Sequence, residues 1–112
     1  MLIIMNIEKK ITDYGTMFLY IVNGDVVGTL DVSEDNEIMC ADVDKHMRRL
    51  GIYTELKNEA LKCFNFLYSV TRSKDSNPIY SKQLGFNVDA NSVIKITKNH
   101  LEIIPDEIYY KN

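Results

Sequence analysis

The chain has 112 residues, of which 46% are hydrophobic and 26% are charged, and its net charge is -3 at pH 7. This length and composition are typical of one globular domain, so we expect a single domain over residues 1–112. The acidic balance argues against a general nucleic-acid-binding surface, although it leaves room for one local basic cluster.

Two further features bear on the compartment. No apolar run approaches the roughly 18 residues of a membrane span, and no basic region precedes the apolar start, as a signal peptide would require. Cys40 and Cys63 lie inside apolar stretches, which favours buried, reduced thiols over a disulfide framework. We therefore expect a cytoplasmic protein that does not engage a membrane.

The first half of the chain has the patterns of β-strands. Residues 2–11 predict a strand, which we place centrally in a sheet because both its faces look apolar. Residues 16–32 predict a hairpin that turns at Asn23-Gly24-Asp25, since Asn-Gly supplies the positive φ of a tight turn. Within its second strand, Gly28 indicates a bulge or a close backbone approach. A polar turn follows over residues 33–36, and then a strand over residues 37–43.

The second half begins with a change of period. Apolar residues from Ile52 to Leu67 recur at helical spacing and predict a helix over residues 52–64. A strand over 66–70 follows, and Asn77-Pro78 favours the start of a short helix that ends at Gly85. Residues 91–98 predict a late strand, and the tail 100–112 could be an edge strand or a docked segment. The predicted fold is α+β, with a mixed, largely antiparallel sheet, one main helix and one short helix.

A local cluster of charge precedes the main helix. Arg48, Arg49 and Gly51 stand directly before it, with Lys45 and His46 close by. The first turn of a helix offers unpaired N–H groups and the positive end of the dipole, and a glycine lets an anion approach the backbone. A phosphate would bind such a site. The alternative is that the basic residues are solvated and the glycine closes a turn. No Gly-Lys-Ser/Thr follows, so the motif is not a P-loop.

Three segments together resemble a known family. The segment "VDKHMRRLGI", residues 43–52, resembles the cofactor-binding motif of the GCN5-related N-acetyltransferases, which places an Arg or Gln five residues after a strand-closing Val and a Gly three residues later. "NPIYSKQLGF", residues 77–86, resembles the family segment in which an Asn precedes a short helix ending in Leu-Gly-Phe. "IVNGDVVGTLDV", residues 21–32, is similar to the family's second and third strands.

The resemblance implies a cofactor and where it binds. In this family the loop before the main helix holds the pyrophosphate of acetyl-CoA through backbone amides, and the pantetheine arm lies along the fourth strand. One strand amide polarises the thioester carbonyl while an amine attacks it. The residues that the resemblance assigns to cofactor binding are Ala41, Asp42, Val43, Arg48, Arg49, Leu50, Gly51, Ile52, Tyr53, Thr54 and Asn77.

The groups that would move protons are less clearly marked. The family places a Tyr where this chain has Ser81, one residue after Tyr80. Tyr80 could protonate the leaving thiolate, Ser81 could act through water, the thiolate could leave unaided, or Tyr80 could be a core aromatic. For the general base we favour Glu37 over Asp31 and Asp42, although a carboxylate at such a position is more often a solvated strand-end charge. His46 and His100 show no metal-ligand spacing, and we expect no metal.

The chain also departs from the family. Tyr53 stands where the family prefers Gly or Ala, so its ring must turn away from the phosphates. Only a few residues near 12–15 separate the first two strands, where the family inserts two helices that wall the acceptor site. A macromolecular acceptor such as a protein, a second subunit or a loss of catalysis would each account for this. We expect an acetyl-CoA-dependent N-acetyltransferase; the alternative is a binding module of the same fold that acts through protein contact.

Overall fold

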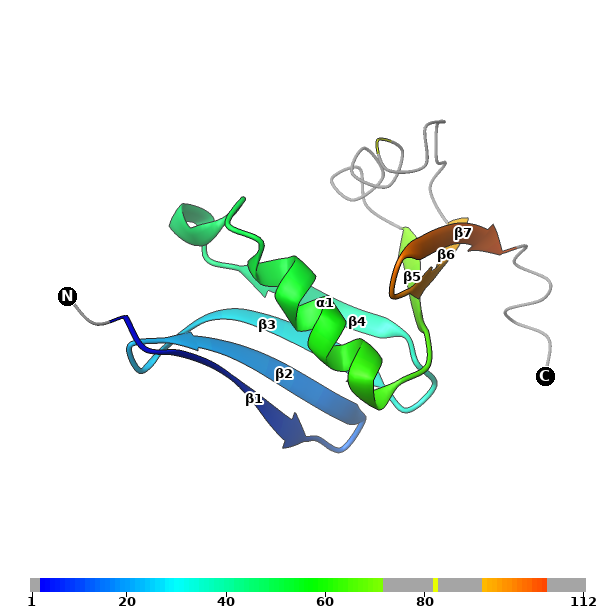
Figure 1. The fold of residues 1–112 in the computed structure, drawn as a ribbon. Coiled ribbons are helices and arrows are strands. Elements are labelled where there is room, and N and C mark those ends of the chain that lie inside the picture. Colours follow the sequence, from blue (N-terminus) through cyan, green and yellow to red (C-terminus); the bar gives the residue numbers. More distant parts are fainter. Residues whose placement is uncertain (1–2, 72–81, 83–91, 105–112) are drawn as a thin grey trace. The chain divides into compact units, whose positions relative to one another are not determined.

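The computed structural model describes residues 3–71, 82 and 92–104, and the chain divides into two compact units, residues 1–65 and 66–112 (Figure 1). The described parts comprise antiparallel sheets and one main helix. The α+β class is therefore confirmed, whereas the single domain and the family-specific features of the fold stay predictions. Among the described residues, no helix is long and apolar enough to cross a membrane.

A four-stranded antiparallel sheet forms the first unit. Its strands are β1 (Met5–Ile11), β2 (Gly15–Val22), β3 (Asp25–Ser33) and β4 (Ile38–Val43), and they lie in the order β1-β2-β3-β4. The predicted hairpin, the polar turn after it and the fourth strand are confirmed. The hairpin turns at Asn23 and Gly24, whose φ angles of 51° and 88° are those that Asn-Gly tolerates best.

The predicted central position of the first strand was wrong. Among the described residues β1 pairs with β2 alone and forms one edge of the sheet. The apolar residues that suggested a second buried face, Ile3 and Ile4, precede the strand and are exposed. Within the strand itself, Asn6, Glu8 and Lys10 make one face polar. Such alternation is typical of a strand with one solvated face.

One helix covers the inner face of this sheet. α1 runs from Ile52 to Cys63, close to the predicted bounds, and it packs over β2, β3 and β4 (Figure 1). Its buried residues Ile52, Leu56 and Ala60 are spaced by four, as helical periodicity requires. They meet the inward residues of β2 and β3, which are Thr16, Phe18, Tyr20, Gly28, Leu30 and Val32.

Gly28 marks the closest approach of the helix to the sheet. A Cβ built at this position would lie 2.8 Å from Cγ2 of Ile52, so only glycine leaves room for the helix. A bulge lies beside it, because Tyr20 pairs with Gly28 whereas Ile21 pairs with Val26. Both readings of Gly28, a bulge and a close approach, are therefore confirmed at or next to this residue.

The two cysteines are free, as expected, but both are exposed, so the prediction that they are buried was wrong. Cys40 lies on β4, one residue after a bulge at Met39, and on the side of the sheet away from α1. Cys63 is the last residue of α1, where the helix has passed the core residue Ala60. An apolar stretch in the sequence therefore does not place the cysteine within it in the core.

The second unit contains β5 (Leu67–Thr71), β6 (Ser92–Thr97) and β7 (His100–Ile104), which form an antiparallel sheet in that order. Leu67, Val93, Ile94 and Ile96 are its buried residues. The strands predicted over 66–70 and 91–98 are confirmed, and residues 100–104 of the tail form an edge strand. The described strands thus pair within two sheets, where we expected one. The predicted short helix over 77–85 lies outside the described residues apart from Lys82.

Candidate phosphate-binding site between β4 and α1

The segment between β4 and α1 reverses the chain in eight residues. Asp44 donates its N–H to the carbonyl of Val27 at 2.8 Å, which extends the β3–β4 pairing by one residue. A single 3₁₀ turn follows over Lys45–Met47. Arg48 is extended, and α1 then begins at Ile52, whose buried side chain fixes the start of the helix against Gly28. The anchored ends leave residues 48–51 exposed between them.

Two residues of this loop are left-handed. Arg49 has a φ of 66° and Gly51 has a φ of 82°, and Gly51 is the N-cap of α1. A non-glycine residue in this region costs roughly 1–2 kcal/mol and tends to occur where function demands it. A left-handed residue followed by a helical one turns successive N–H groups toward one side, an arrangement that binds anions. The positive φ of Gly51 adds a conformational reason for glycine here to the expected one, which was the approach of an anion to the backbone.

The helix start itself is open. Gly51, the N-cap of α1, has no side chain, and no side-chain capping hydrogen bond is made at the helix start. Apart from its two chain neighbours, no atom of the described residues lies within 4 Å of a Cβ built at Gly51. The described residues therefore leave space for an anion beside Gly51, in front of the positive end of the helix dipole.

Arg48 brings a positive charge to the same place. Its Nε donates a hydrogen bond to the carbonyl of Val43 at 2.9 Å, and its Nη2 lies 3.9 Å from the Asp42 carboxylate. Both side chains are largely exposed, so the ion pair contributes little to stability. The bond to Val43 instead holds the guanidinium at the end of β4, beside the loop. Lys45 and Arg49 are also exposed and add charge.

β4 has a second set of backbone groups that faces away from β3. The N–H of Asp44 bonds to β3. By the alternation of an antiparallel ladder, the N–H and C=O of Asp42 also point toward β3, whereas those of Ala41 and Val43 point toward the other edge. Among the described residues β3 is the only strand that pairs with β4. Of the three strand residues expected to contact a cofactor arm, Ala41 and Val43 thus turn main-chain groups to the open edge, where the carbonyl of Val43 already accepts from Nε of Arg48.

The side chains of the helical first turn divide by environment. Ile52 is a core residue with an exposed fraction of 3%, so only its main chain can reach a ligand. Thr54 is exposed and Tyr53 is half-buried. Leu50 is 66% exposed and stands beside Gly51. An apolar side chain that is this exposed in a basic loop could cover the apolar part of a bound ligand.

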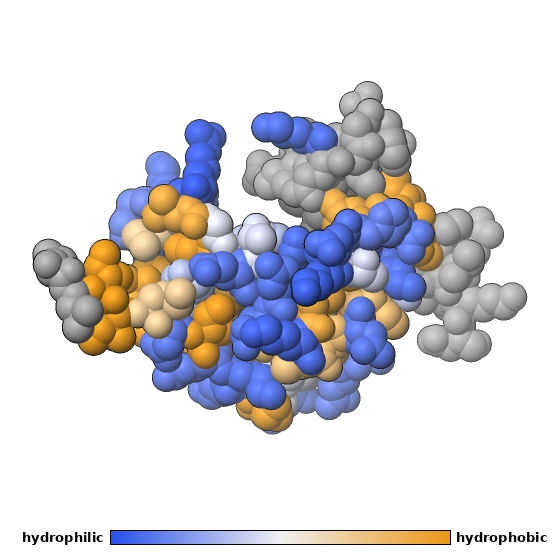
Figure 2. All heavy atoms as spheres, viewed as in Figure 1, coloured by the Kyte–Doolittle hydropathy of each residue, from blue (hydrophilic) through white to orange (hydrophobic). Residues whose placement is uncertain are grey.

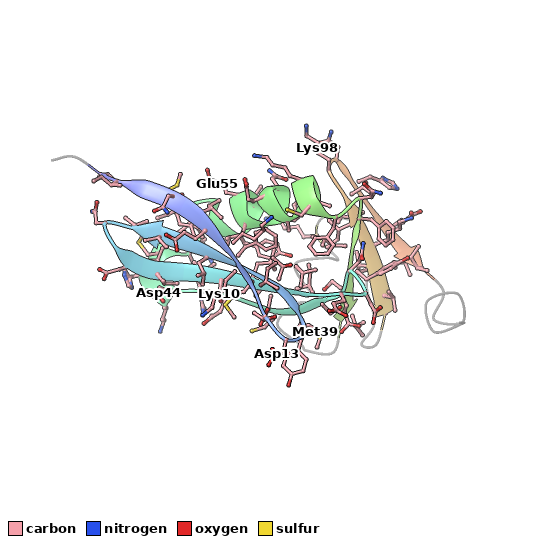
Figure 3. All side chains as sticks on the ribbon, turned by 90° about the horizontal axis from the view of Figure 1, so that it is seen from below. Lys10, Asp13, Met39, Asp44, Glu55 and Lys98 are labelled. Atoms are coloured by element: carbon pink, nitrogen blue, oxygen red, sulfur yellow. The ribbon has the colours of Figure 1, made fainter. Side chains whose placement is uncertain are left out.

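Glu37, the favoured general base, lies at the opposite end of β4 from the loop. Its N–H donates to Oγ of Ser33 at 3.1 Å and its carbonyl accepts from the N–H of Ser33 at 2.8 Å. Six strand residues separate it from Asp44, which is about 20 Å at the usual strand rise. Figure 3 shows Asp44 and Met39, two residues after Glu37, well apart along the sheet. Glu37 and the loop therefore cannot touch the same small group.

One pair of polar residues was not anticipated from the sequence. The Tyr20 hydroxyl donates a hydrogen bond of 2.7 Å to the carboxylate of Glu55, joining β2 to the first turns of α1. This hydrogen bond, together with burial of the phenol and the negative charge of Glu55, raises the pKa of Tyr20 to about 12. The sequence did place both residues near the core, because Tyr20 lies two residues after Phe18 on the inward side of β2 and Glu55 directly precedes Leu56. Their pairing depends on the crossing of helix and sheet.

Several predicted site residues cannot be placed. Asn77, Tyr80 and Ser81 lie outside the described residues, so their roles stay predictions. The described parts of the chain contain no group of three or more His, Cys, Asp or Glu side chains that could hold a metal ion. Comparisons with protein-family models, with curated proteins and with solved structures found no match.

Proposed function

We propose that the chain binds acetyl-CoA through the loop between β4 and α1 and transfers its acetyl group to an amine. The observation that carries this proposal is the uncapped start of α1 behind the left-handed Gly51, with space for an anion and the guanidinium of Arg48 held alongside. A pyrophosphate matches this arrangement because it presents several acceptor oxygens and negative charge at once.

The open edge of β4 supports the second half of the proposal. A pantetheine arm carries amide groups, and an edge strand offers alternating N–H and C=O groups to such a partner. Ala41 presents its N–H and C=O on this edge, and Val43 presents its N–H, since the carbonyl of Val43 accepts from Nε of Arg48. The phosphates at the loop and the thioester farther along β4 would then be bound by one continuous stretch of main chain.

The chemistry that such binding requires is modest. An amine nitrogen attacks the thioester carbon, the C–S bond breaks, and the sulfur leaves as a thiol after it gains a proton. A backbone N–H of β4 would stabilise the developing oxyanion. Glu37, at the end of β4 remote from the phosphates, is the proposed base that takes the proton of the amine, and Tyr80 or Ser81 is the proposed acid.

The second candidate function is a binding module that keeps the phosphate site and acts through protein contact. The short connection between β1 and β2 favours it, because only Thr12, Asp13 and Tyr14 join the two strands. Tyr14 is 79% exposed, and no helix lies between β1 and β2 in the sequence. An acceptor site here is open, which also suits a protein acceptor.

Calorimetry with CoA and acetyl-CoA tests the phosphate site. We expect micromolar binding by the wild type and at least about a tenfold loss in Arg49→Asn, because a hydrogen bond to a charged group is worth about 1.5–3 kcal/mol. Asn tolerates the left-handed conformation, so the variant removes the charge and keeps the backbone. Lys62→Asn, which makes the same charge change at the far end of α1, is the matched control.

Gly51→Asn probes the space in front of the helix. It keeps the positive φ but adds a side chain where the ligand would lie, so affinity should fall while stability changes little. Gly51→Val is a poorer probe because a β-branched residue is strained at a φ of 82°. Equal affinity in wild type, Arg49→Asn and Gly51→Asn would defeat the proposal. Acetyl transfer to a panel of amines and peptides then separates the enzyme from the binding module.

A further inference from the structure

The outer edge of β1 is regular and open. β1 pairs with β2 in an unbroken register from Met5–Val22 to Ile11–Thr16, without the bulges found in the other pairings of this sheet. Among the described residues no strand occupies its other side. Regular edges of this kind are templates for another strand, which is why proteins commonly distort or cover them. The other edge of this sheet, β4, is distorted by the bulge at Met39.

The main-chain hydrogen bonds show which residues face outward. Asn23 donates its N–H to the carbonyl of Ile4, and Thr12 donates its N–H to the carbonyl of Gly15. The even-numbered residues of β1 therefore bond to β2, and the alternation of the ladder turns the N–H and C=O groups of the odd-numbered residues outward. These residues are Met5, Ile7, Lys9 and Ile11.

The side chains of β1 divide between two faces. The odd-numbered residues lie on the side of the sheet that α1 covers. Lys9 contacts Cys63 at the end of α1, whereas Met5 and Ile11 are 45% and 73% exposed. Glu8 and Lys10 lie on the opposite face and are exposed. Figure 2 shows both hydrophobic and hydrophilic residues along the margin that β1 occupies in Figure 1.

This strand is complementary to itself in one register. If two copies pair antiparallel about a two-fold axis at Lys9, Ile7 lies opposite the partner's Ile11, and Glu8 lies opposite the partner's Lys10. The symmetry makes each of these pairs twice. An axis at Glu8 would instead set Glu8 against itself and Ile7 against Lys9. An axis at Ile7 would set Lys9 against Met5 and Glu8 against Asn6.

We propose that β1 is a dimerisation strand that joins two copies of this chain into one continuous antiparallel sheet, in the register centred on Lys9. The odd-numbered residues then exchange main-chain hydrogen bonds, and the Glu8–Lys10 pairs occupy the close, non-hydrogen-bonded positions. Lys9 meets its own copy at the axis. Its ammonium group is already directed toward Sγ of Cys63 in its own chain, at 3.8 Å, which carries it away from the two-fold axis.

A charge-swap series measured by sedimentation equilibrium tests this interface without any cofactor. The wild type should dimerise, and Glu8→Lys or Lys10→Glu should each raise the dissociation constant about tenfold or more, because two attractive pairs become repulsive. The double variant Glu8→Lys/Lys10→Glu restores both pairs with their signs exchanged and should dimerise like the wild type. Lys45→Glu, a charge reversal at another exposed site of the same unit, is the matched control.

Two results would overturn the proposal: a wild type that stays monomeric at the highest concentration reached, or single variants that dimerise as well as the wild type. Ile11→Lys provides a disruption that is independent of the charge pairs, and it too should favour the monomer. Circular dichroism of each variant serves as the check that it is folded. The substituted side chains are exposed, so folding should persist. Failure of CoA binding would leave this result unaffected, because dimerisation is measured with the protein alone.

Discussion

Tyr20 and Glu55 show how a single polar contact can position the helix that carries the proposed site. The phenol of Tyr20 lies almost wholly buried between β2 and α1, while the carboxylate it binds is exposed. Figure 3 shows Glu55 on α1 above the sheet. Because Glu55 stands four residues after Gly51, this hydrogen bond fixes the rotation of the first helical turns and thus the direction of the N–H groups beside the loop.

The pH dependence of stability should reveal this contact. Tyr20→Phe should lower the free energy of unfolding by about 1 kcal/mol near neutral pH, the typical value of one hydrogen bond. The pKa of Tyr20 rises on folding from 10.0 to about 12, so the folded state binds the phenolic proton more tightly than the unfolded state. The stabilisation is therefore complete below pH 10 and is lost as the pH rises from 10 to 12.

Urea unfolding of the wild type and of Tyr20→Phe at several pH values measures this difference. The two stabilities should converge above pH 10. A difference that stays constant from pH 8 to pH 12 would show that the hydroxyl contributes through packing and not through its proton.

At the scale of elements, the contact of Gly28 with Ile52 sets the position of α1 on the sheet. Cγ2 of Ile52 would lie 2.8 Å from a Cβ at position 28, and this carbon cannot swing away easily because a β-branched side chain in a helix has one preferred rotamer. Gly28→Ala should therefore force the start of α1 outward and cost about 1–3 kcal/mol.

A double-mutant cycle measured by chemical denaturation tests this contact. Ile52→Ala alone should cost about 2–5 kcal/mol, because it leaves a cavity at a buried position. In that background Gly28→Ala should cost much less than in the wild type, since the added methyl group then occupies vacated space. Purely additive costs would mean that Gly28 is required for its bulge and not for the helix contact.

The elements that sequence reasoning predicted well are those with local causes. Asn23-Gly24 specifies its turn through backbone preference, and the spacing of Ile52, Leu56 and Ala60 specifies a helix within twelve residues. The place of β1 and the division into two sheets depend on pairings between distant residues, which no local pattern encodes. The apolar Ile3 and Ile4 before β1 misled the prediction for this reason.

The features of the candidate site also divide into those with local causes and those that depend on contacts between more distant residues. The helix start after Gly51 was anticipated from the local sequence, whereas the positive φ of Gly51 was not. The bond from Arg48 to the carbonyl of Val43 was not anticipated either, because it requires the loop to fold back on the strand. The separation of Glu37 from the loop follows directly from the length of β4.

At the scale of the whole molecule, the proposed function requires that the start of α1 and the open edge of β4 together form a site for CoA. The most direct measurement is a titration of ¹⁵N-labelled protein with CoA, followed through its backbone amide resonances. We expect the largest shifts of amide resonances at Gly51 and Ile52, with further shifts at Ala41 and Val43. Saturating CoA that leaves these four amides unshifted, or that shifts only amides outside β4 and the loop, would contradict it.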